Sequence, residues 1–345
     1  MRLRRTIGAA AALAMALALA ACGDDGAASP SGTDDEGASL TVYSGRDEEF
    51  VGPLFEQFED DSGIELEVRY GDSAELAATI MEEGDSSPAD LFLSQDAGSL
   101  GAVADRDLFS QIDAAILDRV DERFRSPDGL WVGTSGRARV AAYNTEELGE
   151  DELPDSILGF TEPAWKGRIG FAPTNSSFQA FVAGMISTEG EEATRSFLEG
   201  LVANDPGLYE DNSSTVRAVA AGEIEVGFVN HYYLYEVSAE DGEIPVANHF
   251  FTGGDPGALV NAAGAGILAS TQNEGAATEL LDYLTGDTGQ AFFAEETWEY
   301  PVVDGFEPQA DLVPLEEIES PNIDLSDLAE TIEPALDLLA EVGLL

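Results

Sequence analysis

The chain has 345 residues, of which 15 are lysine or arginine and 68 are aspartate or glutamate, giving a formal net charge of −53. So negative a protein argues against nucleic acid as a partner, because the phosphates would be repelled. The single cysteine excludes a disulfide within the chain and a metal site built on cysteines.

The N-terminus has the features of an export signal. Three arginines among the first five residues precede an apolar run from Ile7 to Ala21. This run is shorter than the roughly 20 residues that a membrane-spanning helix needs, so it fits a cleaved signal sequence better than a permanent anchor. It ends in Leu19-Ala20-Ala21-Cys22, the lipobox arrangement of bacterial lipoproteins. We therefore predict a signal peptide at 1–21, an acylated Cys22 and a lipid-anchored protein at the extracytoplasmic face of the cell membrane. The alternative is an ordinary secretory peptide with an incidental cysteine.

Residues 22–38 are rich in Gly, Ser, Ala, Asp and Glu. This composition buries too little apolar surface to fold, which predicts a flexible tether. Without the three leader arginines, 12 basic residues face 68 acidic ones, a net charge of −56. The acids are scattered, which is typical of a surface adapted to saline surroundings. The remaining stretch of roughly 305 residues is too long for one core and suits two lobes.

From residue 39 the sequence alternates between strand and helix patterns. We expect a strand at 39–43, a helix from Phe50 to Phe58 that Gly63 ends, a strand at 64–70, a helix at 74–83 and a buried strand at 91–93. This alternation is typical of a parallel α/β sheet. Because ligands bind at the carboxyl ends of such strands, the loops that follow them should surround one mouth. These loops are residues 44–47, 71–73 and 94–96.

The second half repeats this pattern with a different sequence. We expect a strand at 168–172 leading into a polar loop at 174–177, a helix at 215–221 capped by Ser213 or Ser214 and stopped by Gly222, and a strand at 224–229 followed by a turn at 230–233. The predicted fold is therefore α/β, with two lobes facing each other across a cleft and a mostly parallel sheet in each lobe.

The sequence offers little for catalysis. It has two histidines, His231 and His249, no cysteine after Cys22, and neither a GxSxG nor an HExxH motif. An enzyme of common type needs a nucleophile and a base that activates it. We therefore predict that the protein is not an enzyme and uses no catalytic cofactor; an exported hydrolase is the weaker alternative.

Two adjacent tyrosines, Tyr232 and Tyr233, follow the strand expected at 224–229. A phenol loses its proton near pH 10, but a hard, highly charged cation can displace that proton. Two phenolate oxygens suit ferric iron, whereas zinc and copper sites usually recruit His or Cys. The pair is therefore a candidate iron site. The alternative is two aromatic residues that pack one on each side of a helix start.

Seven short motifs occur in an order and spacing that are specific when taken together. They are Thr41-Val42-Tyr43-Ser44-Gly45-Arg46, Ser87-Pro88-Ala89-Asp90-Leu91-Phe92, Ser135-Gly136-Arg137-Ala138-Arg139-Val140, Trp165-Lys166-Gly167-Arg168, Asn230-His231-Tyr232-Tyr233, Phe292-Phe293-Ala294 and Glu299-Tyr300-Pro301-Val302. With them, nearly all of residues 39–345 resembles the periplasmic ferric-ion-binding proteins, the substrate-binding components of iron ABC importers. The resemblance implies a type II two-lobe binding protein, ferric iron held by Tyr232 and Tyr233, a membrane permease as partner, and a monomer.

The resemblance also implies a small anion, phosphate or carbonate, that completes the coordination of the iron. The family's anion-holding positions fall on Arg139, Ser176, Ser177, Asn212 and Asn230, with Asn175 and Arg137 as further candidates. Ser and Asn side chains beside a helix start can hold an oxyanion, and an arginine adds a planar, charged fork. The alternative role for the two arginines is a salt bridge on an acidic surface.

The sequence departs from the family in its first lobe. Many relatives carry a histidine where this chain has Asp47, and a family glutamate falls on Gln95, with Asp96 beside it. These three residues are further candidates for the metal site, and Asp47 is the first of them because its carboxylate is a hard donor. The third tyrosine that some relatives use in the second lobe is absent.

The expected lobes are 39–138 with 263–313, and 139–262 with 314–345. Ligand should close the cleft by a hinge motion, and the closed form should present both lobes to the permease. One alternative keeps the fold but changes the cargo to an organic or oxyanion ligand, which arginines and aromatic residues would also serve.

Overall fold

The computed structural model describes residues 39–303, 305–306 and 312–345. The predicted signal peptide, Cys22 and the tether at 22–38 lie outside these residues. In the described part of the chain, none of the helices combines the length and the apolar character that crossing a membrane requires.

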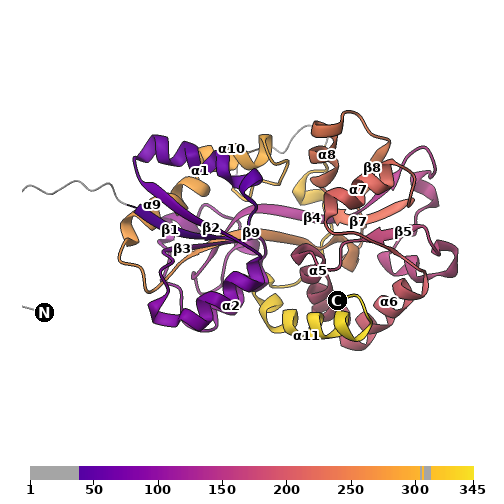
Figure 1. Ribbon diagram of the computed structural model, residues 1–345, viewed down its shortest axis with the longest axis horizontal. Helices are drawn as coiled ribbons and strands as arrows, with labels where there is room; N and C mark the ends of the chain where they lie inside the picture. The colour runs from indigo at the N-terminus through magenta and orange to yellow at the C-terminus, as the bar shows by residue number, and fades with distance from the viewer. Residues whose placement is uncertain (1–38, 304, 307–311) are drawn as a thin grey trace, which may run out of the picture. The chain divides into compact units, whose positions relative to one another are not determined.

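The strands of the described residues hydrogen-bond in the order β2-β1-β3-β9-β4-β7-β5-β6, with β8 also paired to β4 (Figure 1). The strands are β1 Ser39–Ser44, β2 Glu65–Tyr70, β3 Leu91–Ser94, β4 Val132–Asn144, β5 Ile169–Phe171, β6 Gly207–Leu208, β7 Val226–Asn230, β8 Val246–His249 and β9 Val260–Ile267. The α-helices are α1 Glu48–Ser62, α2 Ser73–Glu83, α3 Ala97–Ala104, α4 Ala114–Leu117, α5 Ser176–Glu189, α6 Glu191–Ala203, α7 Asn212–Ala220, α8 Tyr233–Asp241, α9 Glu274–Leu284, α10 Asp287–Glu295 and α11 Leu328–Glu341.

The first strand group, which we define as β1, β2 and β3, confirms the predicted alternation of strands and helices. β1 pairs in parallel with both β2 and β3, and α1 and α2 occupy the segments between them in the chain. The buried face of α1 carries Val51, Leu54, Phe55 and Phe58, as the helical spacing predicts. The helix ends at Gly63, whose φ of 74° is the left-handed conformation that glycine adopts without steric cost.

The second strand group, which we define as β5, β6, β7 and β8, also contains parallel pairs, because β5 pairs in parallel with β6 and β7. Here α7 starts at Asn212, three residues before the expected start. The predicted cap at Ser213 or Ser214 is wrong. Asp211 caps the helix instead, because its carboxylate accepts a hydrogen bond from the backbone N–H of Ser214 at 2.6 Å.

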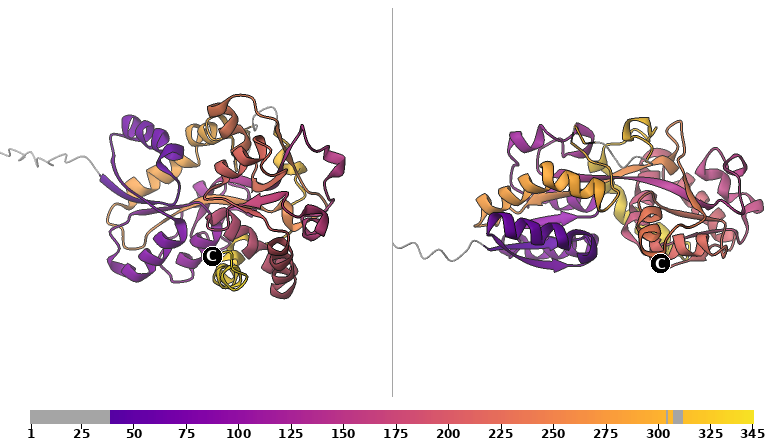
Figure 2. Two further views of the ribbon diagram at one scale, coloured as in Figure 1. Left: turned by 45° about the vertical axis from the view of Figure 1, so that its right-hand side comes forward. Right: turned by 90° about the horizontal axis from the view of Figure 1, so that it is seen from above.

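β4 and β9 connect the two strand groups (Figures 1 and 2). Residues 132–138 of β4 pair with β9, and residues 139–144 pair with β7 and β8, so β4 changes partner between Ala138 and Arg139. Both strands run antiparallel to their neighbours. The expectation of mostly parallel sheets therefore holds within β1–β3 and within β5–β7, whereas β4, β8 and β9 pair antiparallel with their neighbours.

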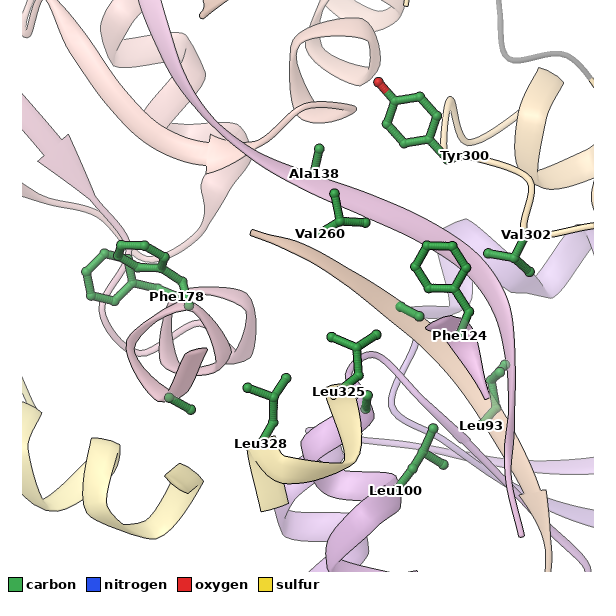
Figure 3. Packing of buried hydrophobic residues seen from close by; sticks show 14 of the residues in the cluster. Leu93, Leu100, Phe124, Ala138, Phe178, Val260, Tyr300, Val302, Leu325 and Leu328 are labelled. Atoms are coloured by element: carbon green, nitrogen blue, oxygen red, sulfur yellow. The ribbon is translucent and has the colours of Figure 1, made fainter. Parts of the chain in front are cut away.

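The last helix, α11, packs against α5 of the second group and against α3 of the first. Figure 3 shows Leu325 and Leu328, at the start of this C-terminal region, on one side of the paired strands β4 and β9, with Tyr300 on the other side. One large cluster of buried apolar side chains extends through both groups, and a smaller cluster gathers around Tyr232 and Tyr233.

Candidate functional site

The loops after the first strands meet as predicted. The N–H of Gly45 donates to the carbonyl of Leu93 at 2.7 Å, and the N–H of Gly71 donates to the carbonyl of Ser44 at 3.1 Å. The N–H of Gln95 donates to Oγ of Ser73 at 2.9 Å. A Cβ at Gly45 would collide with the same Ser73 hydroxyl, so this position needs glycine. The three loops are therefore tied into one rim at the carboxyl ends of β1, β2 and β3.

The adjacent tyrosines lie at the start of α8, where Tyr232 is the N-cap and Tyr233 is the first helical residue. Their ring centroids are 4.2 Å apart with an angle of 31° between the planes, and both side chains are buried. The rings therefore lie side by side rather than one on each side of the helix start. Phe50 of α1, in the first strand group, packs edge-on against Tyr232 with ring centroids 5.9 Å apart.

Tyr233 is strongly disposed to keep its proton when no cation is near. Burial raises its pKa well above the usual value of a phenol, and the neighbouring phenol of Tyr232 raises that pKa further through its charge and a hydrogen bond. A hydrogen bond from Asn212 has the opposite effect on this pKa. A ligand that binds the phenolate must therefore displace the proton, which a highly charged cation can do.

Three buried arginines lie close enough to the tyrosines for their charges to interact. Arg46, Arg137 and Arg139 are each 2–3% exposed. Nη2 of Arg46 lies 2.9 Å from Oε2 of Glu299, and Nε of Arg137 lies 3.4 Å from Oε1 of the same carboxylate, whose side chain is 0% exposed. Glu299 thus pairs with two of the three guanidiniums.

The charges of the arginines and tyrosines act on one another. Burial lowers the pKa of Arg139 to about 9, which leaves it charged at pH 7, and negative charge on Tyr233 and Tyr232 opposes this effect. Burial and the like charge of Arg46 lower the pKa of Arg137, whereas Glu299 and the two tyrosines act to raise it. Because these interactions are mutual, the guanidiniums favour the phenolate form of the tyrosines.

The polar residues at the starts of α5 and α7 form one hydrogen-bonded group. Oδ1 of Asn175 accepts hydrogen bonds from the backbone N–H of Ser177 at 3.0 Å and from Nδ2 of Asn212 at 3.0 Å. Nδ2 of Asn212 also donates to Oγ of Ser177 at 3.1 Å. Oδ1 of Asn212 is buried and has no hydrogen-bond partner within the described residues. Since Asn212 also bonds Tyr233, this group adjoins the tyrosine pair.

A small cavity lies beside this group, with a volume of about 10 Å³, room for about one water molecule. Its lining residues are Gln95, Asp96, Arg137, Arg139, Ser177, Phe181, Asn230, Leu259 and Asn261. Arg139 donates from Nη2 to the carbonyl of Phe228 at 2.7 Å and from Nη1 to Oδ1 of Asn230 at 3.5 Å. Its Nε is buried without a hydrogen-bond partner in the described part of the chain. The cavity is thus lined by a buried cationic side chain that still has one unused donor.

The candidates of the first lobe are placed differently from one another. Asp47 is exposed at the N-cap of α1, whereas the adjoining Arg46 is buried. Gln95 accepts a hydrogen bond from Oγ of Ser176 at 2.6 Å, which joins the two strand groups. Asp96 caps α3 and accepts hydrogen bonds from the N–H and the hydroxyl of Ser99 at 2.8 and 3.0 Å. The structure therefore gathers every candidate except Asp47 around the tyrosines and the cavity.

Sequence reasoning missed two members of the site, Arg46 and Glu299. Arg46 was detectable, because few basic residues occur in the chain and this one follows a strand at the predicted mouth. Glu299 carried no such signal among 68 acidic residues. Within the described residues, no cluster of three or more His, Cys, Asp and Glu side chains is placed to hold a metal ion.

Known proteins resemble this chain over most of its length. A family model described as bacterial extracellular solute-binding protein matches residues 86–324. The Fe(3+)-binding periplasmic protein of Serratia marcescens is 33% identical over 309 residues, which are 89% of this chain and 90% of the relative. The major ferric iron-binding protein of Neisseria meningitidis is 32% identical over 311 residues, 89% of this chain and 93% of the relative. The crystal structure of iron-bound HitA from Pseudomonas aeruginosa is 32% identical and superposes with a TM-score of 0.85, covering 89% of this chain and 100% of that chain.

Proposed function

The chain belongs to the bacterial extracellular solute-binding protein family, and from this premise we propose that it captures ferric iron outside the cell membrane and delivers it to an ABC importer. The predicted resemblance and the type II two-lobe fold are confirmed by the relatives and by the superposition with HitA. Relatives named for iron binding support a role in transport rather than catalysis.

The observation that carries the proposal is the tyrosine pair. Two buried phenols with ring centroids 4.2 Å apart can direct two oxygen donors toward one cation. Ferric iron is hard and highly charged, so it can replace both phenolic protons. Three guanidiniums nearby stabilise the resulting phenolates.

The buried charges also support a co-bound anion. Burial raises the pKa of Asp96. If Asp96 and Glu299 are both ionised, the three guanidiniums leave one surplus positive charge, and formation of two phenolates changes this to one surplus negative charge. Ferric iron then leaves two positive charges uncompensated. A doubly charged phosphate or carbonate would compensate them, and Arg139, Ser176, Ser177, Asn212 and Asn230, with Asn175 and Arg137, are the groups that we propose to hold it.

The metal-free protein tests this proposal directly. Ferric iron should give a visible phenolate-to-iron charge-transfer colour, and each tyrosine that ligates should release a proton. The affinity should fall as the pH falls, because Tyr233 is protonated without metal and added protons compete for its oxygen. Spectrophotometric and potentiometric titrations measure both effects. A protein that stays colourless and releases no protons contradicts the iron proposal.

Arg139→Ala tests the anion. The variant should lose roughly 10- to 100-fold in iron affinity in phosphate or carbonate buffer, and less in buffer free of both, because the guanidinium acts through the anion. Arg168→Ala is the matched control, since Arg168 is partly exposed and paired with Glu225. An equal loss in every buffer would show that Arg139 is structural, and Arg137→Ala would then be measured in the same buffers.

The second candidate function is binding of an organic or oxyanion ligand by the same fold. Arg139 lines the small cavity and its Nε has no partner in the described part of the chain, which favours this candidate, since an oxyanion that reached this nitrogen could accept its hydrogen bond without any metal. Calorimetry with phosphate in the absence of iron separates the two functions. Tight binding of phosphate alone would favour the second candidate.

Capture and release require the two lobes to move relative to one another. We propose that the first lobe comprises residues 39–138 and 263–313, and that the second comprises residues 139–262 and 314–345. The change of partner along β4 between Ala138 and Arg139 supports the first limit. Helix α11 contacts both strand groups, so it can follow either lobe. Closure around the cargo would present both lobes to the permease.

We also propose that an acylated Cys22 anchors the mature chain, as a monomer, at the extracytoplasmic face of the membrane. Cys22→Ser should move the protein from the membrane fraction to the soluble fraction or block processing of residues 1–21, because the thiol is the acylation site. Fractionation and mass spectrometry check this, with Ser29→Ala as a control in the tether. If the Cys22→Ser variant stayed bound to the membrane at its mature size, the proposed lipid anchor at Cys22 would be refuted.

A further inference from the structure

His231 lies between Asn230 and the tyrosine pair, and its side chain is completely buried. Its ring Nδ1 lies 3.2 Å from the backbone N of Ala138, whose N–H donates to it. Its Nε2 lies 2.9 Å from the backbone carbonyl of Trp298. Because Nδ1 accepts an amide proton, the ring proton is on Nε2 and is donated to that carbonyl. The imidazole is thus neutral and satisfied at both nitrogens.

The two partners of the ring belong to different parts of the fold. Ala138 is the residue at which β4 changes partner, and its carbonyl also accepts the backbone N–H of His231 at 3.0 Å. Trp298 follows α10, in the segment assigned to the first lobe. The imidazole therefore joins the turn that carries the tyrosines to the connecting strand and to the opposite lobe.

The segment of residues 298–300 has a constrained backbone and contacts both His231 and the arginines of the site. Trp298 has a φ of 53°, a left-handed conformation that costs a bulky residue energy and persists only where the surroundings fix it. The next residue, Glu299, holds Arg46 and Arg137. Tyr300 then stacks on the imidazole of His231 with ring centroids 4.5 Å apart. Three consecutive residues of this segment thus contact either His231 or the arginines of the site.

We propose that His231 is a positioning residue for the metal-binding tyrosines, holding their turn to β4 through Nδ1 and to the Trp298 carbonyl through Nε2. The inference rests on the proposed iron function and extends it, because it adds a residue outside the proposed iron and anion ligands. The Trp298 bond spans the two lobes, so it stabilises the arrangement in which Tyr232 and Tyr233 face the first-lobe residues. Losing it should speed the release of iron more than it slows capture.

Two substitutions separate the two ring nitrogens. Asn at 231 places an oxygen near the position of Nδ1 and keeps the Ala138 bond, but it is too short to reach Trp298. Gln at 231 places an N–H near the position of Nε2 and keeps the Trp298 bond. We expect His231→Asn to raise the iron dissociation rate about 10-fold and to shift the charge-transfer band, since one buried hydrogen bond is lost and the phenolates reorient. We expect His231→Gln to release iron at close to the parent rate, because it keeps the bond between the lobes, and the backbone bond from residue 231 to the Ala138 carbonyl still holds the turn to β4 when the Nδ1 bond is lost.

The matched control is His249→Asn, which changes the other histidine, located at the end of β8 and beside Glu150. Stopped-flow release to a chelator, the absorption spectrum and the melting temperature of the metal-free protein are recorded for all three variants. Parent-like release and spectrum in His231→Asn would overturn the inference. Fast iron release from His231→Gln would also overturn the inference. This variant provides the test on its own if His231→Asn does not fold. Failure of the iron function itself is distinct, because the parent protein would then bind no iron.

Discussion

Replacing both Tyr232 and Tyr233 with phenylalanine is expected to remove iron binding, with a loss in affinity well beyond the roughly 100-fold that loss of an outer hydrogen-bond partner costs a metal site. The substitution keeps both rings and removes only the two oxygens, so the packing against Phe50 is retained. The charge-transfer colour should disappear with the phenolates. Equilibrium dialysis against a competing chelator and the visible spectrum measure the two effects.

Each single Phe variant should lose most of the affinity and part of the colour, because one phenolate remains. Tyr209→Phe is the matched control, since Tyr209 is a partly buried tyrosine that precedes α7. All variants should melt like the parent without iron. Parent-like affinity in the double variant would end the iron proposal and leave the oxyanion function as the stronger candidate.

The second large effect concerns stability without any ligand. Glu299→Gln is expected to lower the free energy of unfolding by about 3–5 kcal/mol, because it removes the carboxylate that pairs with both Arg46 and Arg137 and leaves buried guanidiniums uncompensated. The amide has nearly the same size, so the loss reports charge rather than a cavity. Urea unfolding of the metal-free protein, followed by circular dichroism, gives the value.

Glu225→Gln is the control for that measurement. Glu225 pairs with Arg168, and both side chains are partly exposed, so solvent screens the pair and its loss should cost about 1 kcal/mol or less. If the two variants lost similar amounts of unfolding free energy, the buried ion pairs of Glu299 would contribute no more to stability than the partly exposed pair of Glu225.

The outer parts of the fold follow from local patterns, whereas the connecting strand does not. The face of α1 with Val51, Leu54 and Phe58 is visible as helical spacing, and Gly63 marks its end. In contrast, β4 is buried along its whole length and yet contains Gly, Ser, Thr and Arg. The partners that its polar side chains do have are distant in sequence, as with Arg139 and Phe228 or Asn144 and Val219, so no local pattern distinguishes this strand from a loop.

The site shows the same division. Tyr232 and Tyr233 stand out because phenols are adjacent at a strand end, and the anion group follows from the family resemblance. The pairing of Arg46 with Glu299 spans 253 residues of sequence, so only the folded chain reveals it. The cap of α7 was missed for a simpler reason, since Asp211, Ser213 and Ser214 are all good capping residues and geometry alone selects Asp211.

The buried guanidiniums place positive charges inside a protein whose overall charge is strongly negative. An anion approaching this chain meets a net charge of −53 before it reaches Arg46, Arg137 and Arg139. Dissolved salt screens the outer charge over a Debye length of roughly 3 Å at 1 M, whereas buried pairs are screened much less. High ionic strength should therefore lower the barrier to the proposed anion and leave its buried partners intact, so a saline medium would favour binding of the anion.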